Sequence, residues 1–306
     1  MRQTNGEIWK DTKGQDIQAH GGMIMEHQDI YYWYGENKAG ANRLSSIGGQ
    51  MVDFIGISCY HSSNLTDWYD DGLVLTPESL ASLKEKVKIV ERPKVIYNKK
   101  MQKFVLWFHY DHDDYSYAAA GVATSSSPTG PFELVKVFHP NRKDVRDMTL
   151  YQENEKAYLI HSSDFNKTMV IAELTDDYLD VTGLYTKILV DQEREAPAIF
   201  RTKDYYFMIT SGTTGWKPNE ALVSRSTHLN IPAKILGNPL TGKDYRKTFF
   251  GQSTYIFQKD NQFYLMLDHW KSTDLRHSGY SILPIVLSED GKDVTIPWTA
   301  HPFETA

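Results

Sequence analysis

Five polar side chains of this sequence each stand directly before a short apolar run. They are His20, Glu91, Asp147, Glu195 and Gln252. Three are carboxyl groups, and carboxyl groups that share a partly desolvated site repel one another and can keep one acid protonated near neutral pH. Such an acid can protonate a leaving oxygen. The pattern therefore predicts general acid chemistry, with Glu195 as the central catalytic candidate.

The segments that follow these residues repeat one plan: a short apolar strand, a turn and an aromatic-rich strand. The copies read HGGMIM–EHQD–IYYWYGE, ERPKVIY–NKKMQK–FVLWFHYD, DMTLY–QENEK–AYLIHSSD, EAPAIF–RTKD–YYFMITSG and QSTYIF–QKDNQ–FYLMLDHW. Periods of roughly fifty to seventy residues are typical of arrays of one supersecondary unit. The sequence predicts an all-β fold, a five-bladed β-propeller.

In a propeller the first strand of each blade lines the central channel. The five polar residues should therefore converge on one mouth of that channel, although they are far apart in sequence. One acidic residue at a strand start is commonly a solvated rim residue, but five polar residues in equivalent places favour function, above all for Asp147 and Glu195.

Other segments are expected to be peripheral. Residues 37–49 form a polar loop, residues 77–88 form a helix with Thr76 as its cap, and DVTIPW near the C-terminus supplies an outer strand or helps to close the ring with the N-terminal segment. The glycines Gly21 and Gly22 allow the backbone to approach the centre or a ligand closely.

Composition narrows the class of protein. The chain has 306 residues, 41% of them hydrophobic, which is enough for one large core, so residues 1–306 are expected to form a single domain. A net charge of −6 disfavours nucleic acid as a partner. No apolar run is long enough to cross a bilayer, and the one cysteine, Cys59, excludes an intrachain disulfide framework. We expect a monomer and leave the cellular compartment open.

Eight segments, in this order, resemble glycoside hydrolase family 43, and most of all its exo-β-1,3-galactanase branch. They are IQAHGG, YYWYGENK, ERPKVIYN, AGVATS, RDMTLY, REAPAIF, TGWKPN and GQSTYIF. The resemblance covers nearly the whole chain. It implies a five-bladed β-propeller and hydrolysis with inversion at the anomeric carbon.

The resemblance also implies roles for individual residues. Glu195 matches the general acid, and Asp147 matches the residue that orients the acid and tunes its pKa. The remaining matches are expected to bind the terminal galactose, with carboxylates accepting from sugar hydroxyls and an aromatic face on the apolar side of the ring. These substrate-binding candidates are Glu36, Glu91, Arg92, Tyr115, Thr214 and Trp216. His20, from its position before the first inner strand, is a further substrate-binding candidate.

One position departs from the wider family. In the family that this chain resembles, most members have an aspartate as general base at the start of the first blade. This chain has Ala19-His20-Gly21-Gly22 there. The resemblance to the galactanase branch implies that Gln252 holds the attacking water. A neutral amide cannot remove a proton at neutral pH, so Gln252 would position the water or act through an unusual tautomer. Glu91 is the alternative base, provided that it lies on the opposite side of the sugar at roughly 6.5 to 9.5 Å from Glu195.

Three functions stay open at this point. The first is exo-acting release of galactose or short galactosyl units from β-1,3-galactan, such as the arabinogalactan backbone. The second is another family 43 activity, that of an α-L-arabinofuranosidase or a β-xylosidase-like hydrolase. The third is a non-catalytic carbohydrate-binding propeller, because the usual base is missing.

No metal and no cofactor are expected. The loop Asp111 to Tyr115 holds His and Asp side chains, but consecutive loop residues lack the spatial spread of a ligand set. The resemblance makes His269 the nearest candidate for an ion near the channel centre, and no complete oxygen-rich ligand set accompanies it.

Overall fold

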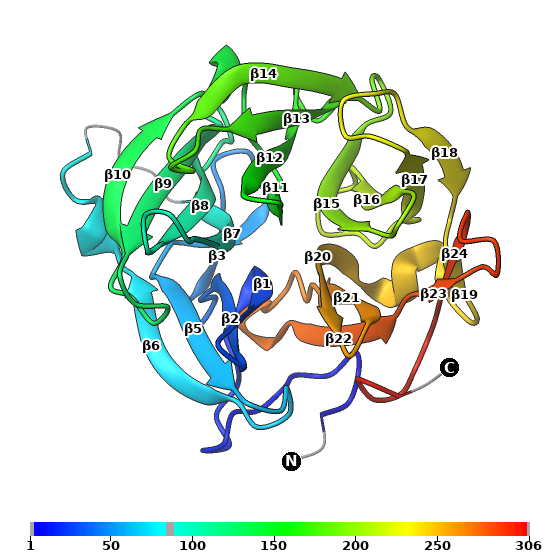
Figure 1. Ribbon diagram of the computed structural model, residues 1–306. Coiled ribbons are helices and arrows are strands. Elements are labelled where there is room, and N and C mark those ends of the chain that lie inside the picture. Colours follow the sequence, from blue (N-terminus) through cyan, green and yellow to red (C-terminus); the bar gives the residue numbers. More distant parts are fainter. Residues whose placement is uncertain (1–2, 84–88, 305–306) are drawn as a thin grey trace.

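The computed structural model describes residues 3–83 and 89–304. Almost all regular structure in these residues is β-strand, in sheets arranged around a common axis (Figure 1). No helix in the described ranges is long and apolar enough to span a membrane. The all-β propeller that the sequence predicted is therefore present.

Four sheets have four antiparallel strands. The first has β1 (His20–His27), β2 (Ile30–Glu36), β5 (Ile57–Ser62) and β6 (Tyr69–Leu75); the second β7 (Ile89–Asn98), β8 (Lys103–Asp111), β9 (Ala119–Ser125) and β10 (Glu133–Phe138); the third β11 (Met148–Glu153), β12 (Lys156–Ser163), β13 (Thr168–Leu174) and β14 (Val181–Ile188); the fourth β15 (Arg194–Arg201), β16 (Tyr206–Gly212), β17 (Leu222–Ser226) and β18 (Lys234–Gly237).

Two further sheets have three strands each. One has β20 (Gln252–Lys259), β21 (Gln262–His269) and β22 (Gly279–Pro284); the other has β19 (Leu240–Thr241), β24 (Val294–Pro297) and β23 (Val286–Leu287). The small hairpin β3 (Asn42–Leu44) and β4 (Gln50–Val52) and the short 3-10 helices η1 (Pro77–Leu80), η2 (Pro140–Arg142), η3 (Tyr245–Phe250) and η4 (Leu275–His277) complete the described elements.

The expected number of five blades is wrong, because the described strands form six sheets of three or four strands and the propeller has six blades. Five sheets give an innermost strand to the centre: β1, β7, β11, β15 and β20, each in contact with the next around the ring (Figure 1). The sixth sheet has no such strand. Its strand β24 contains DVTIPW residues and pairs in parallel with β19, so this segment does not become an outer strand of the blade that starts at Gln252.

Two other expectations are corrected. The predicted polar loop 37–49 contains β3, which pairs with β4 as a hairpin. The predicted helix 77–88 begins at Pro77 as expected, but η1 ends at Leu80 as a 3-10 helix, and residues 84–88 lie outside the described part. Thr76 does precede this helix, and its N–H donates to the Ser79 hydroxyl at 3.3 Å.

Apolar side chains fill the space between neighbouring sheets. Each pair of adjacent sheets around the ring shares its own cluster; for example, Trp107 of the second sheet and Leu150 of the third belong to one. The sixth sheet packs Leu240 and Ile296 onto the cluster between the β15 and β20 sheets. This packing fixes the angle between blades and so holds the ends of the inner strands in place.

The ring is closed near the chain ends. The N–H of Gly6 donates to the Tyr280 carbonyl of β22 at 2.8 Å, and the N–H of Tyr280 donates to the Glu7 carbonyl at 3.0 Å. The N-terminal segment therefore lies along the outer side of β22.

Candidate active site

The first residues of the inner strands are aimed by β-bulges. The pairing register shifts between His20 and Met23 in β1, between Glu91 and Lys94 in β7, and between Glu195 and Ala198 in β15. Bulges bend a strand and redirect side chains, and they are common beside active sites. Within these bulges Arg92 and Ala196 have positive φ angles of 53° each. Glu91, Arg92 and Glu195, at the bulges of β7 and β15, line the cavity described next, whereas His20 does not.

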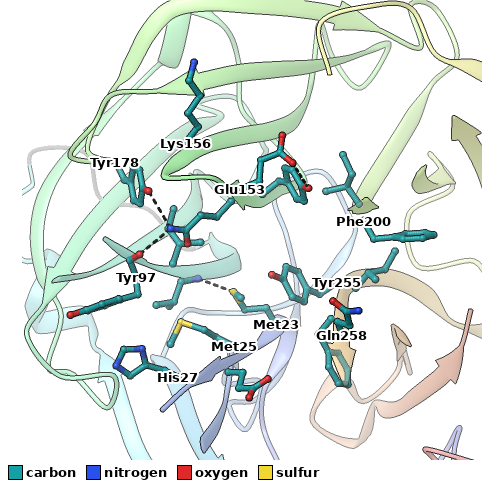
Figure 2. Close-up of a pocket in the computed structure, with 18 of the residues that line it drawn as sticks. Met23, Met25, His27, Tyr97, Glu153, Lys156, Tyr178, Phe200, Tyr255 and Gln258 are labelled. Atoms are coloured by element: carbon teal, nitrogen blue, oxygen red, sulfur yellow. Dashed lines mark hydrogen bonds between the residues drawn. The ribbon is translucent and has the colours of Figure 1, made fainter. Parts of the chain in front are cut away.

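These strand starts surround a cavity of 420 Å³. It is lined by most of the side chains that the sequence singled out: Glu36, Glu91, Arg92, Tyr115, Asp147, Glu195, Trp216 and Gln252. Pockets for small ligands have volumes of roughly 300 to 1,000 Å³. A larger cavity of 1020 Å³ opens at the opposite ends of the same strands (Figure 2), but none of the predicted site residues lines it. The smaller cavity is the candidate active site because the carboxyl groups meet there.

Arg92 and Asp147 form a buried ion pair at the wall of this cavity. The guanidinium Nε and Nη2 donate to the two Asp147 carboxylate oxygens at 2.9 and 2.7 Å. Asp147 Oδ2 also accepts a hydrogen bond from the backbone N–H of Ala196, the residue directly after Glu195, at 3.0 Å. A bidentate pair of this kind is geometrically specific. It locks Asp147 beside the Glu195 backbone.

The Gln252 amide makes four hydrogen bonds that fix its orientation. Its Oε1 accepts from Arg92 Nη2 at 2.7 Å and from Trp270 Nε1 at 2.8 Å. Arginine and tryptophan only donate, so the amide oxygen must face them. The amide nitrogen then faces Glu195 Oε1 at 3.0 Å and Ser211 Oγ at 2.9 Å.

Glu195 is therefore arranged as an acid. Burial raises its pKa to about 8, and the negative charge of Asp147 acts in the same direction, against the opposing effects of Arg92 and of the Gln252 hydrogen bond. A carboxyl group with this pKa is largely protonated at neutral pH. Since Oε1 accepts from Gln252, the proton belongs on Oε2, which remains available to a substrate oxygen.

We expect Asp147→Asn to move the alkaline limb of the activity profile to lower pH. Activity requires protonated Glu195 and is lost as pH rises through its pKa. Removing the Asp147 charge lowers that pKa, and the Arg92 charge, no longer neutralised, lowers it further. The profile of kcat/KM against pH measures the shift. Asp204→Asn, at an exposed carboxylate outside both cavities, is the control, and a limb unchanged from the parent would remove Asp147 from the tuning role.

Glu91 sits in a different electrostatic environment. Burial alone would raise its pKa, but the interaction with His109 and the charge of Lys38 hold it at about 2. Its Oε1 lies 3.7 Å from Lys38 Nζ and accepts from the Tyr115 hydroxyl at 3.4 Å. Lys38 also pairs with Glu36 at 2.8 Å. Ionised Glu91 is a good acceptor for sugar hydroxyls and a poor acceptor for a proton.

A wall of the cavity comes from the hairpin β3–β4 and the loop that carries Trp216. The Trp216 indole N–H donates to the Gln50 carbonyl at 2.8 Å, and its ring meets Trp270 edge to face at 5.2 Å. Thr214 does not line the cavity: its hydroxyl donates to the Lys217 carbonyl at 2.6 Å within the loop, and Thr213 is the lining residue.

His20 lies behind the cavity wall. It is fully buried, and its ring stacks on Tyr280 with the ring centroids 4.9 Å apart. Its Nε2 forms a hydrogen bond with the Tyr280 hydroxyl at 3.1 Å. Burial lowers its pKa. Gly22, two residues later, is required for close packing, because a Cβ there would lie 1.7 Å from the Tyr34 carbonyl oxygen.

The candidate metal positions have other structural partners. His269 Nε2 lies 2.7 Å from the Ser281 hydroxyl, and burial lowers the His269 pKa to about 4. Asp111 pairs with His109 at 2.8 Å and accepts from the backbone N–H groups of Tyr117 and Ala118. Within residues 3–83 and 89–304, no group of three or more His, Cys, Asp or Glu side chains is placed to hold a metal ion.

Sequence reasoning missed three residues of the site, Lys38, Ser211 and Trp270. Lys38 is 2% exposed and neutralises two carboxylates. Its position two residues after Glu36, just beyond an inner hairpin, is a signal that could have identified it. Trp270 directly follows β21, two residues after Asp268, which pairs with Gln252, and could have been found from that pairing.

Comparison with known proteins gives a consistent result. Residues 18–292 match the family described as Glycosyl hydrolases family 43. No match was found among curated proteins. A family 43 β-1,3-galactosidase, solved with galactodeoxynojirimycin, is 35% identical with a TM-score of 0.88, covering 98% of this chain and 99% of its own.

Two exo-β-1,3-galactanases are also similar. The enzyme of Phanerochaete chrysosporium, solved with β-1,3-galactotriose, is 30% identical with a TM-score of 0.85, covering 96% of this chain and 66% of its own. The enzyme of Clostridium thermocellum is 32% identical with a TM-score of 0.84, covering 97% and 65%. With a matching family over most of its length and a cavity that holds an acid with a raised pKa, this chain belongs to glycosyl hydrolases family 43 and is a glycoside hydrolase.

Proposed function

We propose that the protein is an exo-acting, inverting hydrolase that releases galactose or short galactosyl units from β-1,3-galactan. The observation that carries the proposal is Glu195, a carboxylic acid with a pKa of about 8, aimed into a 420 Å³ cavity by its hydrogen bond to Gln252. The similar structures named above as β-1,3-galactosidase and exo-β-1,3-galactanase support the choice of sugar and linkage.

The cavity supports attack at a chain end. Its volume is at the lower end for small-molecule sites, and the hairpin β3–β4 lines one side through Ser45, Ile47 and Gln50. A terminal sugar and its neighbour fit such a space better than a long segment of polymer does. Glu91, Arg92 and the Glu36–Lys38 pair offer charged partners for sugar hydroxyls, and Trp216 offers an aromatic face.

In the proposed mechanism Glu195 Oε2 protonates the departing glycosidic oxygen while water attacks the anomeric carbon from the other face. Asp147 and Arg92 hold the acid in place and set its pKa. Inversion places the water and the acid on opposite sides of the sugar, with roughly 6.5 to 9.5 Å between the acid and the group that acts on the water.

The group that holds the water is assigned to Gln252. Its amide now lies 3.0 Å from Glu195, so it can take this role only if the sugar enters between the two side chains and breaks their hydrogen bond. Glu91 is the weaker alternative, because a carboxylate whose pKa is about 2 is a poor proton acceptor.

Product analysis tests the proposed activity. The protein is expected to release galactose from β-1,3-galactan and to cleave an aryl β-galactoside, but not an aryl α-L-arabinofuranoside. Turnover of the arabinofuranoside alone would move the enzyme to another activity of the family. Binding of galactan without turnover of any substrate would indicate a non-catalytic propeller.

A further inference from the structure

The 1020 Å³ cavity lies at the far ends of the inner strands from the active site (Figure 2). Its lining includes the last residues of β1, the end of β7 and the ends of β15 and β20. Gly21 and Arg92 line the active-site cavity, whereas Met23 and Val95 of the same strands line the second cavity, so the two cavities open on opposite sides of a short stretch of the inner strands. Nothing in the proposed mechanism uses this second cavity.

Aromatic rings and hydroxyl groups form much of its wall. The rings include Tyr97, Tyr151, Phe200, Tyr255 and Phe263. Figure 2 shows the Tyr255 side chain reaching toward Met23 at the middle of the cavity. Among the described residues, the Tyr97 and Tyr255 hydroxyls have no hydrogen-bond partner. Polar donors are therefore available beside flat apolar faces.

Charge at this cavity is balanced. Four cationic side chains, Lys99, Lys100, Lys156 and Arg201, face four carboxyl groups, Glu26, Glu153, Glu155 and Asp176. Several are already paired within the protein: Arg201 with Glu153 at 2.8 Å, and Lys156 with Glu173 at 2.9 Å. A phosphorylated or strongly anionic ligand would find no excess of positive charge. The wall suits a neutral molecule that has both hydroxyl groups and apolar faces.

We propose that this cavity is a second, non-catalytic carbohydrate site, which holds a neutral segment of the galactan substrate away from the catalytic centre. This inference rests on the proposed function for the identity of the sugar. Aromatic rings pack on the apolar faces of a pyranose, and the free tyrosine hydroxyls hydrogen-bond to its hydroxyl groups. Holding one part of the polymer raises the local concentration of chain ends near the active site.

Two variants test the site. Tyr255→Phe removes one free hydroxyl without changing ring volume, and Tyr97→Ala removes a ring from the wall. In the double variant KM for β-1,3-galactan is expected to rise about three- to tenfold, while kcat/KM for a small aryl β-galactoside stays within about twofold, because only the polymer reaches both cavities. Tyr185→Ala, at a tyrosine that is 44% exposed on β14, is the control and should change neither value.

Gel retention separates this inference from the proposed function. The Glu195→Gln protein, whose galactan hydrolysis is expected to be about 10² to 10⁴-fold slower, is expected to be slowed in a gel that contains β-1,3-galactan, and less so when Tyr97→Ala and Tyr255→Phe are added. Unchanged KM and unchanged retention would overturn the second site while leaving the activity intact. Equal losses on polymer and aryl galactoside would also overturn it. Absence of galactan hydrolysis by the parent enzyme would instead reject the proposed function.

Discussion

Glu195→Gln is expected to lower kcat on β-1,3-galactan by about 10² to 10⁴-fold, the usual contribution of general acid catalysis. The amide keeps the shape of the side chain but has no proton to transfer to the glycosidic oxygen. An aryl galactoside with a good leaving group needs less protonation, so its hydrolysis should fall much less. The ratio of the two losses measures the acid role directly.

The neighbouring Glu193→Gln is a matched control, since Glu193 is exposed two residues earlier in the chain. It should leave both activities unchanged. Equal and small losses on both substrates in Glu195→Gln would remove Glu195 from the acid role. A large loss on both, with a lowered melting temperature, would point to misfolding instead.

Gln252→Ala is expected to lower kcat by about 10²-fold, as for loss of one preorganised polar group that acts in the transition state. The galactose dissociation constant should change little, because the amide acts on the attacking water and the acid rather than on the ground-state sugar. Its loss also leaves the Trp270 indole and part of the Arg92 guanidinium without their acceptor. Single-turnover kinetics and galactose titration separate the two effects, with Gln192→Ala at an exposed position as control.

Glu91→Gln is the comparison that decides the base. If Glu91 is a hydroxyl ligand, this variant should weaken galactose binding together with turnover. Near-native turnover in Gln252→Ala, combined with an inactive Glu91→Gln that binds galactose normally, would assign the base to Glu91. Gln252→Glu, which places a conventional carboxylate base there, should keep measurable activity.

The position of the site was predictable because it depends on repeated local patterns. Glu91, Asp147, Glu195 and Gln252 each precede an apolar strand, and equivalent strand starts in a propeller meet at one mouth. The structure places all four around one cavity. His20 has the same sequence position, but the bulge that follows it directs its ring to Tyr280 and away from the cavity.

The number of blades was not predictable in the same way. The pairing of β19 with β24 joins Leu240 to Ile296, which are far apart in sequence, and the two strands are two and four residues long. Strands this short do not show the repeated strand–turn–strand pattern by which the other blades were predicted. The hairpin β3–β4 was missed for a similar reason, since its strands have only three residues each, half of them polar, and their role comes from contacts such as Trp216 with Gln50.

The Gln252 network was also beyond the reach of the sequence. The motif GQSTYIF locates the glutamine, but only the structure shows that Arg92 and Trp270 hold its oxygen and that its nitrogen meets the acid. Arg92 and Glu195 belong to two other sheets, and Trp270 directly follows β21 of the sheet that contains Gln252. Their convergence is a property of the closed ring and not of any one segment.

The anomeric form of the first sugar released from β-1,3-galactan tests the central claim most directly. Proton NMR during the first minutes of hydrolysis distinguishes α-galactose from β-galactose before the two forms interconvert. An inverting exo-enzyme with Glu195 as its acid releases α-galactose, or a short galactosyl unit with an α reducing end, from the chain end. Initial release of the β-anomer, or of long internal fragments, would contradict the account.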